Sequence, residues 1–173
     1  MIRAYIALGA NLGDPAAQLR AGVAALAGTA HTRVVACSRL WRTPAWGARQ
    51  QPDYLNAAIA ADTALSPEAL LDTLLAIERA HGRVRDGTRY GPRTLDLDLL
   101  LYGAQRVDSA VLQVPHPQLA RRAFVLLPLA ELAPQLVIPG TCATVPELLA
   151  GVDTAGCVAL GPLCPVVPPR QRA

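Results

Sequence analysis

Lysine is absent from the sequence of 173 residues, so all sixteen basic residues are arginines. Aromatic residues are scarce, at 4% of the chain, and no stretch of about 18 consecutive apolar residues occurs. The lack of lysine excludes a P-loop, because the motif G-x-x-x-x-G-K-[ST] contains one. The scarcity of aromatic residues argues against an RNA-binding module that stacks bases on its sheet. The third absence predicts a chain without a membrane-spanning helix.

Closely spaced cysteine pairs are also missing. Cys37, Cys142, Cys157 and Cys164 form no C-x-x-C motif and no cluster with histidine. We therefore expect four free thiols in a reducing compartment. The N-terminal sequence MIRAYIALGANLGD reaches polar and glycine residues too early for a signal peptide, which predicts a cytoplasmic protein.

The length and the hydrophobic content of 52% suit one compact domain with a substantial core. The net charge of +3 is too small to indicate a polyanionic partner by itself. We expect a single domain at residues 1–160. Residues 161–173, GPLCPVVPPRQRA, are too rich in proline for a regular element and are predicted to form a disordered tail.

The hydrophobic periodicity predicts alternating strands and helices. Pro15 and Pro67 suit the first turns of two helices, and Ser66 suits the N-cap of the second. The order is β-α-β-β-α-β, the split βαβ pattern of ferredoxin-like folds, which are α+β proteins with an antiparallel sheet. The expected strands span residues 2–8, 31–43, 54–63 and 91–103, and the expected helices span residues 15–28 and 67–82.

Additions to this core are expected in the C-terminal part of the chain. Residues 113–117, QVPHP, have the composition of a rigid turn. The apolar segment 123–134 and the segment 144–151 are predicted to be helical, the first in part and the second as a short helix.

Two aspartates interrupt the leucine-rich stretch GPRTLDLDLLLYG. In a strand, Asp96 and Asp98 would point to the same side as Thr94, with α-carbons roughly 7 Å apart. Such a pair can hold Mg²⁺ against phosphate oxygens; it can equally lie on an exposed face, solvated or paired with arginine. The other side should face the core and carries Leu95, Leu97, Leu99 and Leu101.

Arginines precede the aspartates in a loop with glycines at 82, 87 and 91. A cationic loop beside two carboxylates suits a polyphosphate lying between them. The alternative is a solvated basic loop that pairs with Asp86. The loop arginines are Arg83, Arg85, Arg89 and Arg93.

Glu78 occupies an unfavourable position on the second predicted helix. It continues the apolar row of Leu70 and Leu74, and it lies near the helix C-terminus, where the helix dipole disfavours an anion. We expect a partner for this carboxylate, either Arg83 in a structural salt bridge or a ligand.

The segment GRVRDGTRYGPRTLDLDLLLYG closely resembles the signature of the 6-hydroxymethyl-7,8-dihydropterin pyrophosphokinase family of folate biosynthesis. Further segments match the family in order, and together they span residues 4 to about 134. An ordered set of this kind is far more specific than one motif. The further segments are AYIALGANLGD, RTPAWG, QPDYLNAA, IERAHGR, VPHP and RAFVLLPLAELAP.

The resemblance implies an enzyme with a ferredoxin-like fold that transfers the terminal pyrophosphoryl group of ATP to the pterin hydroxymethyl oxygen and leaves AMP. It implies two Mg²⁺ ions at Asp96 and Asp98, with Arg83 and Arg93 completing the catalytic set. The implied partners are ATP and 6-hydroxymethyl-7,8-dihydropterin, without nucleic acid or membrane. We expect a monomer.

The resemblance also implies a pterin pocket. Tyr54 and Phe124 would stack on the ring, although each alone also suits ordinary core packing. Asn56 shares a strand face with Tyr54, and its amide can both donate to and accept from a pterin edge. The remaining pterin contacts would come from Thr43, Pro44 and Trp46.

For ATP, the family pattern implies contacts from residues on both sides of the aspartates. His116 lies between two prolines and is interpreted as a phosphate contact, not as a general base. The implied ATP-binding residues are Glu78, Arg83, Arg85, Arg93, His116 and Arg122.

Three positions depart from some family members. Tyr90 stands where a tryptophan is expected, Val111 where an arginine occurs, and Pro117 where a tyrosine occurs. These departures affect details of nucleotide binding. Three alternative functions stay open from the residues: a nucleotidyltransferase with a D-x-D metal site, a ferredoxin-like RNA-binding module, and a noncatalytic member that serves as an assembly partner.

Overall fold

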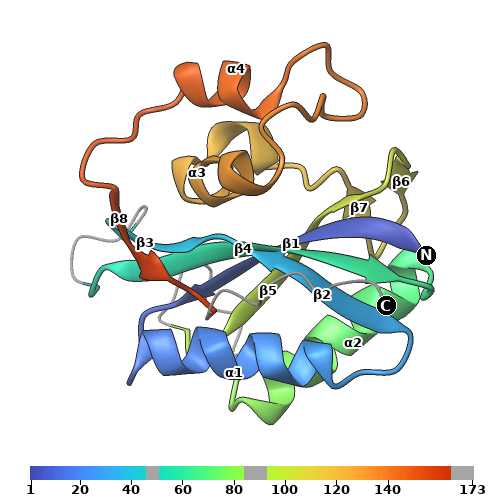
Figure 1. Cartoon of the computed structure of the whole chain (residues 1–173), viewed down its shortest axis with the longest axis horizontal. Coiled ribbons are helices and arrows are strands. Elements are labelled where there is room, and N and C mark those ends of the chain that lie inside the picture. Colours follow the sequence, from blue (N-terminus) through green and yellow to red (C-terminus); the bar gives the residue numbers. More distant parts are fainter. Residues whose placement is uncertain (46–50, 84–92, 165–173) are drawn as a thin grey trace, which may run out of the picture.

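A six-stranded antiparallel sheet with helices on both faces is the framework of the computed structural model, which describes residues 1–45, 51–83 and 93–164 (Figure 1). The main strand order is β5-β1-β4-β3-β8, and β2 pairs with β4 beside β3. The strands of this sheet are β1 (Ile2–Ala10), β2 (Thr32–Cys37), β3 (Arg39–Thr43), β4 (Tyr54–Thr63), β5 (Asp96–Tyr102) and β8 (Val158–Pro162).

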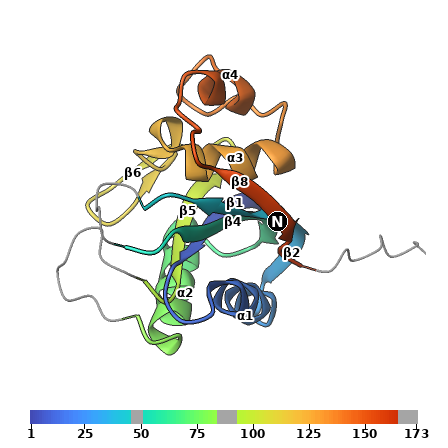
Figure 2. The ribbon, with the colours of Figure 1, turned by 90° about the vertical axis from the view of Figure 1, so that its left-hand side faces the viewer.

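The helices form a layer on each side of the sheet. Helices α1 and α2 cover one face, and α3 covers the other with α4 packed on its outer side, as both ribbon views show (Figures 1 and 2). The remaining elements are α1 (Pro15–Ala27), α2 (Pro67–Ala80), α3 (Ala123–Leu132), α4 (Val145–Ala150), a 3-10 turn at Leu119–Arg121, and a two-stranded ribbon of β6 (Val107–Asp108) and β7 (Gln113–Val114).

The predicted β-α-β-β-α-β order and the ferredoxin-like α+β class are confirmed. Strand β1 lies between β4 and β5. The helices begin at Pro15 and Pro67 as expected, and Ser66 is the predicted N-cap, since it accepts from the amide of Ala69 at 3.2 Å. Asp14, which was not predicted as a cap, accepts from the amide of Ala17 at 3.0 Å. The C-terminal helices predicted at 123–134 and 144–151 are α3 and α4.

The strand predicted at 31–43 is interrupted at Ser38, which separates β2 from β3. Ser38 compensates for the interruption, because it exchanges bonds with one residue of β4. Its amide donates to the carbonyl of Ala58, and its Oγ accepts from the amide of Ala58, both at 2.9 Å. The backbone groups of Ala58 are therefore hydrogen-bonded even where the strand is interrupted.

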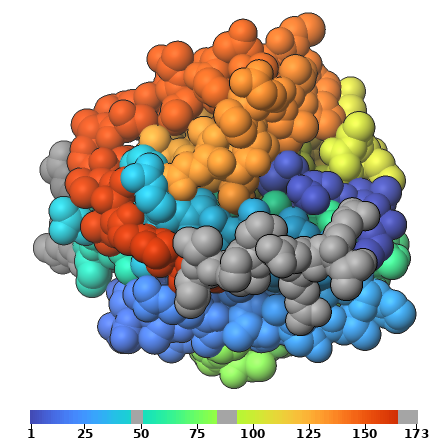
Figure 3. Space-filling model, viewed as in Figure 1, coloured from blue at the N-terminus to red at the C-terminus, as the bar shows by residue number. Residues whose placement is uncertain are grey.

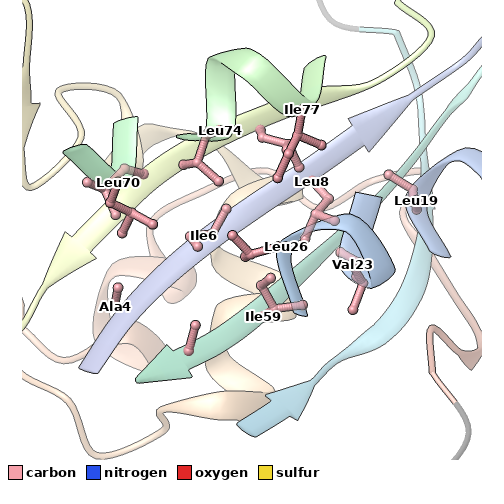
Figure 4. Close-up of a cluster of buried hydrophobic side chains, with 14 of the residues drawn as sticks. Ala4, Ile6, Leu8, Leu19, Val23, Leu26, Ile59, Leu70, Leu74 and Ile77 are labelled. Atoms are coloured by element: carbon pink, nitrogen blue, oxygen red, sulfur yellow. The ribbon is translucent and has the colours of Figure 1, made fainter. Parts of the chain in front are cut away.

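The larger core fills the space between the sheet and the pair α1 and α2 (Figure 4). Its side chains come from the helix faces with the expected periodicity and from one side of β1 and β4. The labelled residues are Ala4, Ile6, Leu8, Leu19, Val23, Leu26, Ile59, Leu70, Leu74 and Ile77.

A second core lies between the sheet and α3, and it corrects one prediction. Leu101 does not share a face with Leu97 and Leu99; it packs with Leu100 in the second core. The reason is a register shift in β5, where Leu101 pairs with Tyr5 and Leu99 with Ile6. The extra residue is a β-bulge, which breaks the alternation of sides.

The boundary predicted after residue 160 is wrong, because it falls inside β8. Pro162 pairs with Arg39 of β3, and Leu163 is fully buried in the larger core. Residues 161–164 are therefore part of the folded unit. Pro162 is tolerated in β8 because an edge strand can do without one backbone N–H donor. The rest of the predicted tail lies outside the described residues. Within those residues, no helix is long and apolar enough to cross a membrane.

We predict that Ser38→Ala destabilises the fold by about 1–3 kcal/mol, because the buried amide of Ala58 loses its acceptor. Urea denaturation of the variant and the parent chain measures this difference. An unchanged denaturation midpoint would contradict the proposed role of Ser38.

Candidate active site

A cavity of about 100 Å³ opens on the α3 side of the sheet. Its walls come from the ends of β1, β3, β4 and β5 and from the start of α3, so five segments that are distant in sequence converge there. The lining residues are Gly9, Thr43, Pro44, Tyr54, Asn56, Arg93, Asp96, Asp98, Arg122 and Phe124. Nine of these ten were predicted as site residues.

One end of the cavity carries the residues predicted for pterin binding. Asn56 is buried, and its Nδ2 donates to Oγ1 of Thr43 at 2.7 Å. The amide is oriented by this bond. Gly9 makes room for it, because a Cβ at position 9 would lie 2.9 Å from Asn56 Oδ1. Tyr54 and Phe124 line the same cavity and bring the two aromatic rings to the amide.

The other end carries the two aspartates, which the prediction placed on one face of β5. Asp96 accepts hydrogen bonds from the guanidinium groups of Arg83 and Arg93. Among the described residues, Asp98 forms no ion pair with an arginine. Burial, together with the nearby charges of Asp96 and Glu78, raises the pKa of Asp98 to about 7.

Glu78 of α2 contacts β5 from the side of the sheet that α1 and α2 cover. Only 1% of its surface is exposed. Its Oε1 accepts from the amide of Leu97 at 2.8 Å and from Arg83. Of the two partners expected for this carboxylate, the structure shows the salt bridge with Arg83. Arg83 thus joins Glu78 to Asp96.

A divalent cation fits the pair Asp96 and Asp98. Within the described ranges no third histidine, cysteine or acidic residue completes a metal-binding cluster with them. Two carboxylates with open coordination positions are the donor set that Mg²⁺ uses when water and substrate phosphates supply the other ligands. A cation there would also relieve the repulsion that raises the pKa of Asp98.

Arg122 and His116 stand at the side of the cavity near α3. The Nε of Arg122 is buried and has no hydrogen-bond partner among the described residues, and its guanidinium lies 5.5 Å from the centroid of the Phe124 ring. An unpaired buried donor of this kind suits an anion. His116 Nδ1 accepts from the amide of Gln118 at 3.1 Å. Burial and the charge of Arg122 lower the pKa of His116, so the ring offers a neutral Nε2–H donor at pH 7.

The structure also identifies two residues that the sequence interpretation missed. One is Gly9. The other is Asn11, which is buried and exchanges two bonds with Arg93, at 2.8 and 3.0 Å. Its Nδ2 also contacts the carbonyl of Pro52 at 3.4 Å. A glycine inside a strand is a signal of close approach and could have indicated Gly9.

Some predicted site residues are not in the cavity wall. Arg83, Glu78 and His116 lie near it without lining it. Trp46 and Arg85 lie outside the described residues, as do Asp86, Arg89 and Tyr90.

Comparison with known proteins agrees with this geometry. The model of the 7,8-dihydro-6-hydroxymethylpterin-pyrophosphokinase (HPPK) family matches residues 5–134. The chain belongs to this family. The match extends just past the end of α3, so every residue of the cavity wall falls within it.

Curated relatives with the name 2-amino-4-hydroxy-6-hydroxymethyldihydropteridine pyrophosphokinase cover nearly the whole chain. The protein of Methylorubrum extorquens is 51% identical over 156 residues, which are 90% of this chain and 97% of the relative. The protein of Pseudomonas aeruginosa is 49% identical over 154 residues, which are 89% of this chain and 94% of the relative.

Solved structures share the HPPK fold at low sequence identity. The crystal structure of Plasmodium falciparum HPPK-DHPS wild type with SDX-DHP matches 87% of this chain with a TM-score of 0.66 and 12% identity. The crystal structure of HPPK-DHPS in complex with substrates matches the same share with a TM-score of 0.68 and 11% identity. This chain covers 43% of each of those longer chains.

We predict that Asp98→Asn is more stable than the parent chain at about pH 8. A carboxyl group whose pKa is raised by folding contributes stability below its unfolded pKa, near 4, and loses it as the pH rises through about 7. Removing the charge should add about 2 kcal/mol, or roughly 4–8 °C in Tm. Calorimetry at about pH 8 and about pH 4 should show the gain only at the higher pH.

Asp96→Asn is the matched control. It loses the ion pairs with Arg83 and Arg93 and should show no such gain. Equal Tm values for Asp98→Asn and the parent chain at both pH values would show that folding does not raise the pKa of Asp98.

Proposed function

We propose that this cavity is the active site in which the chain transfers the terminal pyrophosphoryl group of ATP to the hydroxymethyl oxygen of 6-hydroxymethyl-7,8-dihydropterin and releases AMP. The reaction is that of the HPPK family, to which the chain belongs. The observation that carries the site assignment is that one cavity joins an oriented amide and two aromatic rings to a carboxylate pair.

The pterin ring would stack between Tyr54 and Phe124. Asn56 would read its polar edge, because the bond to Thr43 leaves the amide oxygen and the second N–H of the same group for a ligand. A ring between two aromatic side chains excludes water from both faces, which strengthens the polar contacts at its edge.

The phosphates of ATP would lie at the other end. Arg93 and Arg122 line the cavity there, and Arg83 reaches Asp96 from the side. Guanidinium groups bind phosphate oxygens in pairs of hydrogen bonds. Mg²⁺ held by Asp96 and Asp98 would neutralise charge on the phosphate chain and align it.

In the reaction, the hydroxymethyl oxygen forms a bond to the β-phosphorus of ATP. The bond from that phosphorus to the oxygen shared with the α-phosphate breaks, and AMP leaves with the electron pair. The residues of the cavity position the two substrates and stabilise charge. Contact of Glu78, Arg85 and His116 with ATP, and of Trp46 with the pterin, is part of the proposal.

Several finer features belong to the same proposal. The enzyme would use two Mg²⁺ ions, act as a monomer in the cytoplasm and fold as a single domain. ATP contacts near Val111 and Pro117 would differ from those of relatives with arginine and tyrosine at these positions. Membership of the enzyme family disfavours the RNA-binding and noncatalytic alternatives. The nucleotidyltransferase alternative is distinguished by its product, because that enzyme would release inorganic pyrophosphate instead of AMP.

The test is an incubation of the protein with ATP, Mg²⁺ and 6-hydroxymethyl-7,8-dihydropterin, followed by chromatography of the nucleotides. We expect AMP in an amount equal to the pterin diphosphate formed. Release of ADP or inorganic pyrophosphate, or nucleotide turnover that does not require the pterin, would defeat the proposal.

Asp96→Ala and Asp98→Ala should each reduce kcat at least roughly 100-fold, because each removes charge that binds the metal. Circular dichroism should show an intact fold in both variants. Normal turnover in either variant would show that the replaced carboxylate is not needed to bind the metal.

Gly9→Ala tests the pterin end separately. The new Cβ would lie 2.9 Å from Asn56 Oδ1, and overpacking of this kind costs about 1–3 kcal/mol. We expect the KM for the pterin to rise about tenfold or more, with a smaller change in the KM for ATP. Gly161→Ala is the control, because a Cβ at 161 meets nothing within 4 Å.

A further inference from the structure

Two cysteines that are 127 positions apart in the sequence meet at the edge of the sheet. The Sγ of Cys37 donates a hydrogen bond to the Sγ of Cys164 at 2.7 Å. Cys37 ends β2, and Cys164 follows β8 two residues after its end. Both side chains are partly exposed, so a small oxidant can reach them. Neither lines the active-site cavity.

The backbone around the pair has the register of two directly opposed residues. Arg39 pairs with Pro162, and the amide of Leu163 donates to the carbonyl of Ser38 at 3.3 Å. Continued by one antiparallel step beyond the end of β8, this register would set Cys37 opposite Cys164. Opposed residues in antiparallel strands have α-carbons about 4.5–5.5 Å apart, which lies within the range of about 4.4–6.8 Å found across disulfides.

The two thiols differ in character. The hydrogen bond from Cys37 lowers the pKa of Cys164, and the charge of Arg20 lowers it further. Arg20 is held close by, since its Nε donates to the carbonyl of Leu163 at 3.0 Å. The same hydrogen bond and burial raise the pKa of Cys37. Burial opposes deprotonation of Cys164, but its pKa is lowered on balance, so it suits the attacking sulfur and Cys37 suits the resolving thiol.

We propose that Cys37 and Cys164 form a reversible disulfide under peroxide stress, and that this bond links the C-terminal strand β8 to the end of β2. Such disulfides in reducing compartments are transient and respond to redox conditions. The four cysteines are free in the structure described here, which is the reduced state of this switch.

The chemistry balances with hydrogen peroxide as the oxidant. The thiolate of Cys164 attacks one peroxide oxygen; an S–O bond forms, the O–O bond breaks, and hydroxide leaves and takes up a proton. The sulfur of Cys37 then attacks the sulfur of Cys164; the S–S bond forms, the S–O bond breaks, and the Cys37 proton leaves in a second water. Two thiols lose two electrons, and one peroxide becomes two waters.

The bond would act on a strand that supports the active site. β8 lies on the surface beside β3, red against cyan in Figure 3. Val158 and Ala159 of β8 pair with Arg42 and Trp41, directly before the cavity residue Thr43. Gly156 also approaches Pro44, since a Cβ at 156 would lie 2.8 Å from the proline ring. Fixing β8 therefore fixes the end of β3.

The test treats the full chain with hydrogen peroxide and counts free thiols after denaturation. We expect the count to fall from four to two, and peptide mapping without reductant to link the peptides that contain Cys37 and Cys164. Dithiothreitol should restore all four. Retention of all four thiols, or a bond that involves Cys142 or Cys157, would overturn the proposal.

Cysteine variants supply matched controls. Cys142→Ser removes an exposed cysteine outside the pair and should still lose two thiols. Cys37→Ser should leave Cys164 as a sulfenic acid that dimedone traps, because the resolving thiol is gone. Cys164→Ser should leave Cys37 unoxidised. Since the thiol count and the mapping are also made on the unsubstituted chain, the result stands even if a variant folds poorly.

Thermal unfolding gives an independent measurement. A bond that closes so long a loop should raise the Tm of the oxidised protein by roughly 5–10 °C. The shift should be the same in Cys142→Ser and absent in Cys164→Ser. An identical Tm for the oxidised and reduced chains would show that the bond does not hold β8. None of these readouts depends on turnover, so they stand apart from the proposed function.

Discussion

The geometry of the site depends on one buried ion pair. Glu78 lies on the apolar face of α2 near its C-terminus, where both the apolar surroundings and the helix dipole disfavour a carboxylate. It nevertheless accepts hydrogen bonds from the amide of Leu97 and the guanidinium of Arg83. Removing either partner would leave a buried charge uncompensated, so the contact is strongly constrained. Through Arg83 it reaches Asp96. The helix that packs the core therefore also sets the position of the carboxylate pair.

The two faces of the sheet have separate tasks because of this arrangement. The face covered by α1 and α2 supplies most of the hydrophobic core, and the face covered by α3 leaves a cavity beyond its smaller core. The bulge in β5 separates these tasks within one strand. Before it, Asp96 and Asp98 face the cavity; after it, Leu100 and Leu101 fill the second core.

The cavity contains polar groups that lower the stability of the fold and that suit the binding of ligands. Asp98 is held where burial raises its pKa to about 7, and the buried Nε of Arg122 lacks a partner among the described residues. Both groups are unsatisfied in ways that a bound cation and an anionic substrate would correct. By contrast, Asn56 and Thr43 satisfy each other in advance, so the end of the cavity that we propose for the pterin is organised before a ligand arrives.

The sequence by itself determined the element order, the helix starts and the shared face of Asp96 and Asp98, because capping and the strand period of two are local properties. It also indicated, through ordered family motifs, nine of the ten cavity residues. Only the tertiary structure decided the side on which Leu101 lies, the burial of Leu163, the brace from Asn11 to Arg93 and the meeting of Cys37 with Cys164. A bulge and a pairing across 127 positions depend on which strands become neighbours, and no local pattern of side chains encodes that choice.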